Sequence, residues 1–409
     1  MPSCETSSPT SLREPPPEVK ILYHHRTASK DGQAVHIEEM ISALREQGHE
    51  VHVVSPAVGS GSGMGDKVGW VHRLRATLPK ALYELMELAY SWVAYRRLLR
   101  AARAFRPDAL YERANLFLLA GVMAKRTLGI PMLLEVNAPL SEERGRFGGL
   151  ALPWLARWSE RAVWRGADCV LPVTRVLGDM VVAAGVPPAR VTVIPNGINE
   201  QHFAAALPPE EARHRLGWGP GIVLGFTGFV RDWHGVDRAL RWMASSDAPR
   251  DAKLLLVGDG PVREELERLG RELGLGDRFR VTGFVDRHEV PALVASFDIA
   301  LQPAVTAYAS PLKLFEYLAM GKAIAAPAVR NIQEVLTHDV NALLFDPTDE
   351  SAFARVLTRL AHDHMLRQRL GDAARRSIAE QGLTWAANAR RVVALAASLQ
   401  GRAGRGAPP

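Results

Sequence analysis

Residues 20–54 read KILYHHRTASKDGQAVHIEEMISALREQGHEVHVV: a short β-branched run, a loop, a helical pattern and a second short run. This succession is typical of a strand–helix–strand unit in a parallel sheet. The alternation continues to Ile194, is interrupted from Pro195 to Pro220 by turn sequences rich in proline and glycine, and restarts at Ile222. We therefore expect an α/β protein with two doubly wound parallel-sheet domains that face each other across a cleft.

Each series contains six strand-like runs, and the last run of the first series is Val191–Ile194. From Leu383 to about Leu399 the apolar spacing predicts a helix with no strand after it. The predicted division is a tail (1–17), a first domain (18–196), a linker (197–220), a second domain (221–382), a helix that packs back on the first domain (383–400) and a tail (401–409).

The composition is that of a globular protein: 409 residues, 47% hydrophobic and 23% charged, with 50 Lys plus Arg against 44 Asp plus Glu. Two cysteines, Cys4 and Cys169, cannot build a disulfide framework, and neither belongs to a CxxC pair. No apolar run approaches the ~20 residues of a membrane span, and residues 1–17 lack the apolar core of a signal peptide. These features exclude disulfide-rich and transmembrane classes and predict a cytoplasmic protein.

The segment TAYASPLKLFEYLAMGKAIAAP (residues 306–327) is the most informative part of the second domain. Ser310 followed by proline is a typical helix start, in which the hydroxyl would cap the helix. The free N–H groups near Leu312 and Lys313, together with the Lys313 charge, would form an anion site. Glu316 lies one turn further, where its carboxylate could accept two hydrogen bonds from a vicinal diol such as ribose. The alternative is an ordinary capped helix with a solvated Lys–Glu pair.

This segment resembles the E-x7-E region of retaining GT-B glycosyltransferases of family 4, also called glycosyl transferases group 1. Glu316 matches the second glutamate, which in the family holds the nucleotide ribose, whereas Tyr308 stands in the place of the first. The resemblance implies the GT-B fold, a nucleotide diphosphate sugar as donor, retention of configuration and no need for a metal. It also implies that the helix start binds the donor phosphates and that Tyr308 lies near the donor sugar.

The loop GFTGFVRDWHGVDRAL (residues 225–240) follows the first predicted strand of the second domain. Gly228 would let the backbone approach a ligand, and Arg231 carries a permanently charged fork that suits a diphosphate. In the family this loop usually carries Arg and then Lys-Gly; Arg231 matches the arginine, and His234 replaces the lysine. A protonated His234 could donate to a phosphate, or His234 could cap the next helix. The alternative for Arg231 is a surface salt bridge.

Smaller matches to the family complete the predicted donor site. VIPNG at 193–197 resembles the segment before the hinge, VGDGP at 257–261 a strand-to-helix turn, and TGFV at 282–285 the loop beside the nucleotide base. The predicted donor-binding residues are Gly32, Gly228, Arg231, His234, Gly258, Gly283, Phe284, Val285, Tyr308, Ser310, Leu312, Lys313 and Glu316.

The first domain would present the acceptor. Gly32 keeps one glycine of the family's Gly-Gly loop, which closes over the donor phosphates, and His36 matches a frequent family histidine. The alternative for His36 is structural, because a single histidine on a helix is often part of the core. No GxGxxG fingerprint occurs in this segment, so an interpretation as a nicotinamide-binding protein has no support.

Polar residues also stand at the ends of two neighbouring predicted strands, in YER at residues 111–113 and in EVNAP at residues 135–139, at positions that should face the cleft. Many family members carry an active-site histidine where Asn137 stands; asparagine can hydrogen-bond a sugar hydroxyl but cannot act as an acid or base. The predicted acceptor-side residues are His36, Glu112, Arg113, Glu135 and Asn137. The alternative for the charged residues is a set of inter-strand salt bridges that support the sheet.

Positive charge is concentrated between Lys67 and Arg106, where nine Lys or Arg stand against two Glu. Leucine and tryptophan residues, among them Trp70, Leu74 and Trp92, interleave with these charges. The pattern is typical of an amphipathic surface that binds an anionic membrane or a lipid phosphate. The alternative is a pair of core-facing helices with a solvated basic face.

Together these features predict an enzyme that transfers a sugar from a nucleotide diphosphate sugar to a glycan, lipid-linked or small-molecule acceptor, in surface polysaccharide or glycoconjugate synthesis. Arg231, Lys313 and Asn137 are the predicted catalytic residues, and the two cations would stabilise negative charge on the departing diphosphate. No metal, cofactor or nucleic acid is expected. The protein is expected to bind peripherally to the inner face of the membrane. The alternatives are a GT-B nucleotide-sugar epimerase and a membrane-docking scaffold derived from such enzymes.

Overall fold

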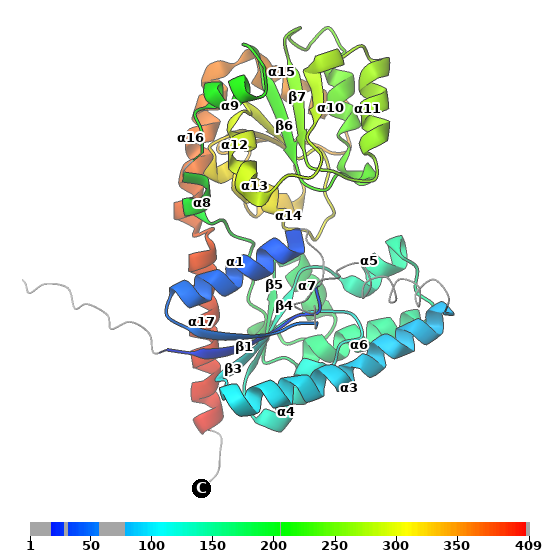
Figure 1. The fold of residues 1–409 in the computed structure, drawn as a ribbon, viewed down its shortest axis with the longest axis vertical. Helices are drawn as coiled ribbons and strands as arrows, with labels where there is room; N and C mark the ends of the chain where they lie inside the picture. The colour runs from blue at the N-terminus through cyan, green and yellow to red at the C-terminus, as the bar shows by residue number, and fades with distance from the viewer. Residues whose placement is uncertain (1–17, 28–31, 57–77, 205, 406–409) are drawn as a thin grey trace, which may run out of the picture.

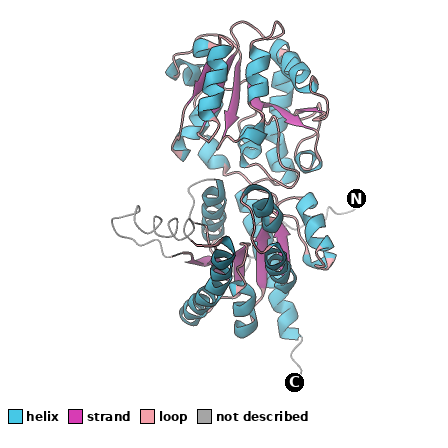
Figure 2. Cartoon of the chain, turned by 90° about the vertical axis from the view of Figure 1, so that its right-hand side faces the viewer, coloured by secondary structure: helices cyan, strands magenta, loops and turns pink. Residues whose placement is uncertain are grey.

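The computed structural model describes residues 18–27, 32–56, 78–204 and 206–405. They form two lobes, one above the other in Figure 1, and each lobe is built around a parallel sheet with helices on its faces (Figure 2). The predicted fold with two doubly wound domains is confirmed. The domain boundaries stay a prediction, and the predicted tail at residues 1–17 lies outside the described part of the chain.

The first sheet has the strand order β2-β1-β3-β4-β5, and all its pairs are parallel. Its strands are β1 (Lys20–His24), β2 (Glu50–Val54), β3 (Ala109–Arg113), β4 (Met132–Val136) and β5 (Cys169–Pro172). Every residue of β3, β4 and β5 is buried, as expected for strands covered on both faces. The order reverses between β1 and β3, so the carboxyl ends of these strands mark the place where such folds bind ligands.

Helices cover both faces of this sheet. The helices of this lobe are α1 (Gly32–Glu46), α3 (Lys80–Phe105), α4 (Ala120–Leu128), α5 (Leu140–Phe147), α6 (Pro153–Gly166) and α7 (Arg175–Ala183), followed by the 3-10 turn η1 (Pro188–Arg190). Leu22 of β1 packs into the core shared with α3, whereas its neighbours Ile21 and Tyr23 pack into the core shared with α1. Since successive residues of a strand point to opposite faces, α1 and α3 lie on opposite sides of the sheet.

The predicted sixth strand of the first domain, Val191–Ile194, is wrong. This segment runs beside β5, and the N–H groups of Thr192 and Ile194 donate to Val170 O and Pro172 O, each at 3.0 Å. An isolated bridge between Val170 and Val191 is all that forms there in the described residues. Pro172 has no N–H with which to continue the ladder, so the sheet ends at β5.

The second sheet has the order β11-β10-β9-β6-β7-β8 and is also parallel throughout. Its strands are β6 (Val223–Thr227), β7 (Lys253–Val257), β8 (Phe279–Val281), β9 (Ile299–Leu301), β10 (Ala323–Pro327) and β11 (Leu343–Phe345), which confirms all the strands predicted for this domain. The order reverses between β6 and β9, so a second ligand site is expected at the carboxyl end of β6.

The helices of this part of the chain are α8 (Glu200–Ala204), α9 (Pro209–Arg215), α10 (Asp237–Met243), α11 (Arg263–Glu272), α12 (Val290–Ala295), α13 (Leu312–Ala319), α14 (Arg330–Gln333), α15 (Ala352–His362) and α16 (His364–Gln381). Short 3-10 turns occur at η2 (Asp232–His234), η3 (Gly276–Arg278) and η4 (Arg287–Glu289). α13 is the one that matters most for the site, because it begins where the two lobes meet (Figure 1).

The last helix, α17 (Trp385–Arg405), crosses back to the first lobe (Figure 1). Trp385 and Ala389 are buried in the core shared with α1, and Gln47 Nε2 donates to Ala386 O at 2.9 Å. The predicted return of the C-terminal helix is confirmed. The helix continues to Arg405, beyond its predicted end at residue 400.

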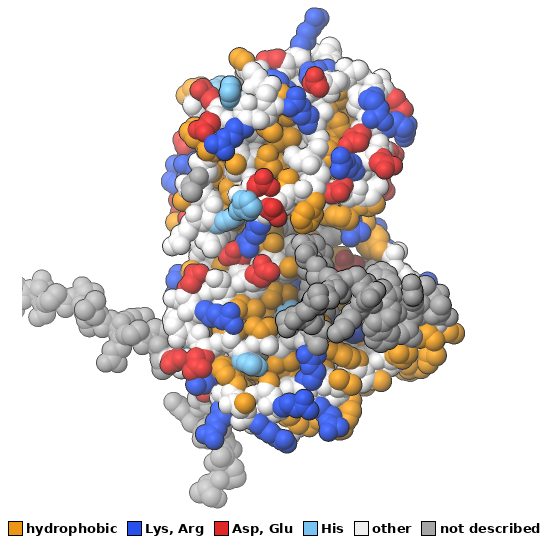
Figure 3. Space-filling view, viewed as in Figure 1, with side chains coloured by type: hydrophobic (Ala, Val, Ile, Leu, Met, Phe, Trp, Pro, Cys, Tyr) orange, Lys and Arg blue, Asp and Glu red, His pale blue; other side chains and the backbone are white. Residues whose placement is uncertain are grey.

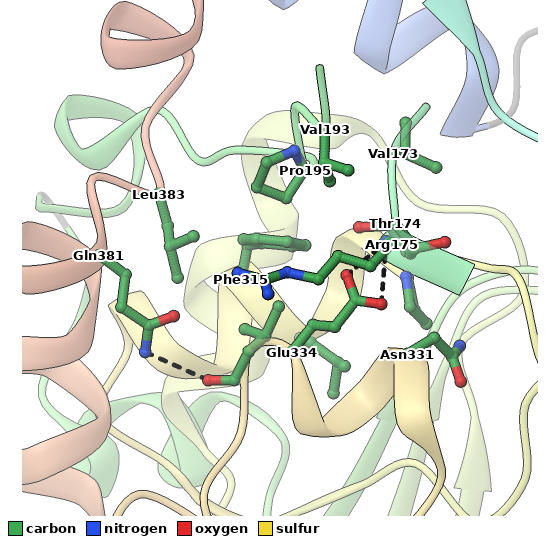
Figure 4. A pocket seen from close by; sticks show the side chains of 14 residues that line it. Val173, Thr174, Arg175, Val193, Pro195, Phe315, Asn331, Glu334, Gln381 and Leu383 are labelled. Atoms are coloured by element: carbon green, nitrogen blue, oxygen red, sulfur yellow. Dashed lines mark hydrogen bonds between the residues drawn. The ribbon is translucent and has the colours of Figure 1, made fainter. Parts of the chain in front are cut away.

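A carboxylate of the second lobe holds the start of a helix of the first. Glu334 accepts the N–H group of Arg175 at 2.7 and 2.9 Å and that of Val176 at 3.3 Å, at the unpaired end of α7 (Figure 4). The Thr174 hydroxyl, which caps the same helix, donates to Tyr308 O at 2.9 Å. A cavity of about 170 Å³ lies beside these contacts, with Glu334 in its wall (Figure 4).

We predict that Glu334→Ala lowers the melting temperature, because the variant removes a carboxylate that caps α7 from the opposite lobe. A capping interaction contributes about 1 kcal/mol, which corresponds to a shift of about 2–4 °C in a domain of this size. Differential scanning calorimetry measures the shift, with the exposed neighbour variant Gln333→Ala as control. Equal melting temperatures for both variants and the wild type would show that this contact adds no stability.

Candidate functional site

The start of α13 lies at the junction of the two lobes. Pro311 takes the N-cap position with an extended backbone (ψ 122°), and no described side chain caps the helix. Asn196 holds Ser310 instead: its N–H donates to the Ser310 hydroxyl at 3.4 Å, and its Nδ2 donates to the Ser310 carbonyl at 2.6 Å. The predicted serine cap is therefore wrong, and the N–H groups at the start of α13 keep their capacity to bind an anion.

Lys313 and Glu316 extend from α13 toward the end of β6. The Lys313 ammonium lies 3.5 Å from the centroid of the Phe226 ring, and burial lowers the pKa of Lys313 to about 7, although Glu316 acts in the opposite direction. The Thr227 hydroxyl donates to Glu316 Oε2 at 3.3 Å, and burial raises the pKa of Glu316. An anion bound beside Lys313 would raise the pKa of this lysine again.

Glycines bring the backbones of three loops together beside Lys313. Gly228 (φ 116°) and Gly258 (φ 133°) have left-handed backbones, and a Cβ on Gly258 would lie 2.3 Å from Gly228 O. A Cβ on Gly228 would lie 3.5 Å from Lys313 Nζ, and Gly283 forms a bridge with Gly258. The carboxyl ends of β6, β7 and β8 thus converge on one backbone surface that side chains would block.

The predicted base-side loop continues from Gly283 into two residues with different surroundings. Phe284 has 75% of its surface exposed, whereas Val285 packs partly against the core of the second lobe. The Phe284 ring is therefore uncovered, as a ring that stacks on a base has to be. Its contact with a nucleotide stays a prediction.

Aromatic rings hold the exposed Arg231 side chain. Its guanidinium lies 5.0 Å from the centroid of Phe229 and 5.1 Å from that of Trp233. The surface salt bridge considered for Arg231 is not found among the described residues. The guanidinium therefore keeps its donors available for a ligand.

His234 has a local partner. The Arg231 N–H donates to His234 Nδ1 at 2.9 Å and closes the turn η2. Burial, together with the charges of Lys313 and Arg231, lowers the pKa of His234 to about 3. The imidazole is neutral near pH 7 and carries its proton on Nε2, and contact of His234 with a phosphate stays a prediction. His234 closes the turn to which it belongs, whereas the next helix, α10, has Val236 at its N-cap and no described side chain that caps it, so the predicted cap of that helix is wrong. The neutral Nε2–H is the donor that His234 can offer.

Gly32 of the first lobe faces α13 of the second. A Cβ on Gly32 would lie 3.4 Å from Leu312 Cδ1, and Leu312 packs against the core under α1. The starts of α1 and α13 therefore meet across the junction, as the predicted closure of this loop over the donor site requires. Asp31, which precedes Gly32, lies outside the described residues.

Glu135, buried at the end of β4, brings most of the predicted acceptor-side residues together. Its carboxylate accepts hydrogen bonds from Arg113, from Asn137 and from the Tyr111 hydroxyl (2.7 Å), and His36 Nε2 lies 3.0 Å away. Burial alone would raise the pKa of Glu135, but His36 and Arg113 hold it well below its usual range. Arg113 and Glu135 thus form the inter-strand salt bridge that was the alternative; contact of this group with an acceptor stays a prediction.

Glu112 lies apart from that group. It is fully buried, bonds to His24 at the end of β1, and fills the space beside Gly121, where a Cβ would lie 2.4 Å from Glu112 Oε2. The expectation that Glu112 faces the cleft is therefore wrong. Successive residues of a strand point to opposite faces, and Arg113 takes the face of Glu135.

The sequence analysis missed polar residues that follow β1. Burial lowers the pKa of His25 to about 4, and Arg113 and Glu135 both act on it by charge. Arg26 lies 4.9 Å from the centroid of the Tyr90 ring and 3.6 Å from Glu87. The available signal was the run of polar side chains directly after a strand, at the end where the strand order reverses.

Among the residues that the structure describes, no three His, Cys, Asp or Glu side chains gather in a way that could hold a metal ion. No described helix has both the length and the apolar composition that crossing a bilayer requires.

Both halves of the chain match family models. A glycosyl transferase 4-like domain matches residues 31–197, and glycosyl transferases group 1 matches residues 210–377. The 2-deoxystreptamine N-acetyl-D-glucosaminyltransferase of Streptomyces fradiae is 31% identical over 308 residues, which cover 71% of this chain and 71% of the relative. The 2-deoxystreptamine glucosyltransferase of Streptomyces kanamyceticus is 30% identical over 258 residues, which cover 60% of this chain and 65% of the relative.

Solved structures share the two-lobed fold. Anabaena Alr3699/HepE in complex with UDP-glucose has a TM-score of 0.71 at 18% identity, over 93% of this chain and 100% of its own. Sucrose-phosphate synthase from Thermosynechococcus elongatus has a TM-score of 0.71 at 18% identity, over 94% of this chain and 100% of its own. Taken with the family models and the 31% identical relative, this likeness leads to the conclusion that the chain belongs to the GT-B glycosyltransferases.

Proposed function

We propose that the protein is a retaining glycosyltransferase that moves a sugar from a nucleotide diphosphate sugar to an acceptor. One observation carries the proposal: the half-buried Lys313, the Arg231 guanidinium beside its aromatic rings and the uncapped start of α13 surround the glycine-rich loop after β6. Ammonium, guanidinium and helix N–H groups all favour a diphosphate. Glu316, beside Thr227, would accept the ribose hydroxyls, and Phe284 would stack on the base.

The proposed chemistry is electrostatic. Breaking the bond between the sugar and the diphosphate leaves negative charge on the distal phosphate. Lys313, Arg231 and the first N–H groups of α13 would stabilise that charge, and donors fixed in advance need no reorganisation during the reaction. Fixed cations would fill the role of a divalent ion, so no metal is part of the proposal. Asn137 would hold an acceptor hydroxyl, since an amide cannot take up its proton.

The comparisons support particular substrates. Solved structures of Anabaena HepE contain UDP or UDP-glucose, which supports a UDP-sugar as donor. Two relatives are named for 2-deoxystreptamine, which supports a small cyclitol as acceptor. A relative from Rhizobium meliloti, 33% identical over 36% of this chain, is named for lipopolysaccharide core biosynthesis. It supports the glycan or lipid-linked acceptor that the sequence predicts.

Thermal shift with UDP, GDP and ADP, followed by turnover with the matching sugar donors, tests this function. Release of nucleoside diphosphate that depends on an acceptor, with a glycosylated product in the mass spectrum, would establish transfer. Conversion of the donor to an epimer without any acceptor would identify the epimerase alternative. Absence of nucleotide binding would leave the scaffold alternative in place of an enzyme.

We predict that Glu316→Gln weakens nucleotide binding tenfold or more and leaves the fold intact, because a carboxylate that faces the ribose is lost. A hydrogen bond to a charged group contributes about 1.5–3 kcal/mol. Isothermal titration calorimetry measures the affinity, and Glu265→Gln, an exposed carboxylate of the same lobe, is the matched control. Unchanged nucleotide affinity of Glu316→Gln would refute the ribose assignment.

Arg231→Ala and Lys313→Ala should each reduce kcat more than donor affinity, because charge accumulates on the phosphate mainly in the transition state. Each loss is expected to be on the order of 10²-fold. His234→Ala should have a smaller effect, because the neutral imidazole carries no charge to the phosphate. Steady-state kinetics decides the matter: a raised KM with normal kcat would make both cations ground-state binders.

We further propose peripheral binding to an anionic membrane through α3. The face of α3 away from the sheet exposes Leu82, Leu85, Met86, Trp92 and Val93, and α6 adds Trp154 and Trp158, which the sequence analysis did not single out. Arg96, Arg100 and Arg103 are exposed further along α3, and Figure 3 shows hydrophobic and basic side chains close together on the lower lobe. Trp70 and Leu74 lie outside the described residues, and Arg97 is engaged with Ser55 O at 2.6 Å.

Arg96→Glu/Arg100→Glu should abolish co-sedimentation with vesicles that contain phosphatidylglycerol. Each Lys or Arg near such a surface contributes about 1 kcal/mol, so reversing two charges has a large effect. The attraction should also fade at 1 M salt, where the screening length is about 3 Å. Arg250→Glu/Arg271→Glu, the same charge change on the exposed surface of the second lobe, is the control. If all variants co-sediment equally, or if the protein binds neutral and anionic vesicles equally, the membrane proposal fails. The basic face of α3 would then be only a solvated surface.

A further inference from the structure

α5 of the first lobe lies against the loop of the second lobe that carries Arg231. The ring centroids of Phe147 and Trp233 are 4.9 Å apart, and Trp233 in turn holds the Arg231 guanidinium at 5.1 Å. Glu143 stands one turn before Phe147, and residues four apart share a face of a helix. Glu143 therefore faces the same loop as Phe147, on the side nearer to Asn137 and the end of β4.

Glu143 has no direct partner within the described residues, although it is half-buried. The arginines of α5 are engaged elsewhere: Arg144 Nη1 binds Glu87 at 2.6 Å, and Arg146 lies 5.4 Å from the centroid of the Phe147 ring. Burial raises the pKa of Glu143, and the charge of Arg231 opposes this effect. Arg231, which comes from the opposite lobe, is thus the cation whose charge acts on Glu143.

We propose that Glu143 competes with the donor diphosphate for Arg231 and, once the diphosphate holds Arg231, binds a hydroxyl or ammonium group of the acceptor. This inference rests on the proposed function. An ionised carboxylate only accepts hydrogen bonds, so Glu143 beside a bound diphosphate selects an acceptor group that donates them. The Glu143 carboxylate and the bound diphosphate are both negative. They repel a third negative group, so an anionic acceptor group is excluded from the position beside Glu143.

The proposal makes Glu143 a positioning residue that links the two substrates. A bound diphosphate neutralises the charge of Arg231, and the unpaired carboxylate of Glu143 then attracts a hydroxyl or ammonium group more strongly, so the acceptor binds best to the enzyme that already holds the donor. Tyr308 also borders this place, since the charge of Glu143 contributes to the raised pKa of Tyr308. The acceptor class that follows is a neutral or amino-substituted ring polyol, whereas a phosphate or carboxylate next to the reacting hydroxyl is disfavoured.

Calorimetric titration of wild type, Glu143→Gln and Glu142→Gln tests the competition, with whichever of UDP, GDP and ADP binds the wild type most tightly. Glu143→Gln should bind this nucleotide about three- to tenfold more tightly, because one like charge near the diphosphate is gone. Glu142→Gln changes the charge of the exposed neighbour and should leave the affinity unchanged. In the transfer assay Glu143→Gln should raise the KM for the acceptor while the KM for the donor falls.

Damage to the fold would weaken nucleotide binding, so a gain in affinity cannot arise from it. Equal affinities of the three proteins, or weaker binding by Glu143→Gln, would overturn the proposal. Tighter binding by both variants would attribute the effect to general surface charge and would overturn it as well. If the wild type binds none of the three nucleotides, the proposed function fails first and independently of Glu143.

Discussion

A lysine ammonium withdrawn from water and placed against an aromatic ring is the constraint on which the site depends. Transferring such a cation from water has a free-energy cost that Phe226 and Glu316 offset only in part, and the pKa of about 7 for Lys313 reflects that cost. The same cost makes the site selective. A diphosphate restores the stabilisation that water provided, whereas a neutral ligand does not. The desolvation cost of the Lys313 ammonium therefore increases the affinity of the site for an anion.

The surrounding backbone is shaped to keep that lysine in place. Gly228 and Gly258 approach so closely that a single Cβ would separate the loops after β6 and β7. The Tyr317 hydroxyl accepts the Thr227 N–H at 2.8 Å and fixes the end of β6 against α13. The phosphate side of the site is thus built from short connections within the second lobe. Its contacts do not depend on the position of the first lobe.

Local pattern was enough to predict this half of the site, because Gly228, Lys313 and Glu316 stand in short motifs at strand ends and a helix start. Local pattern failed where contacts between residues far apart in the sequence determine the structure or the charge state. The charge state of His234 depends on burial and on Lys313, the face taken by Glu112 depends on the register of β3, and the missing strand at Val191–Ile194 depends on a proline in its neighbour. Glu143 gave no signal, since only the contact between α5 and the loop at Trp233 places it.

The course of α17 has a consequence for biosynthesis. Its residues Trp385 and Ala389 complete a core whose other members, including Ile21 and Met40, leave the ribosome first. The first lobe therefore cannot finish packing before α17 has left the ribosome, although its strands are available early. The core of the second lobe extends to Leu383, just before Trp385, so the lobe that is synthesised first is completed last. During that interval the apolar side chains of the first lobe that α17 covers, among them Ile37 and Met40, stay exposed to solvent.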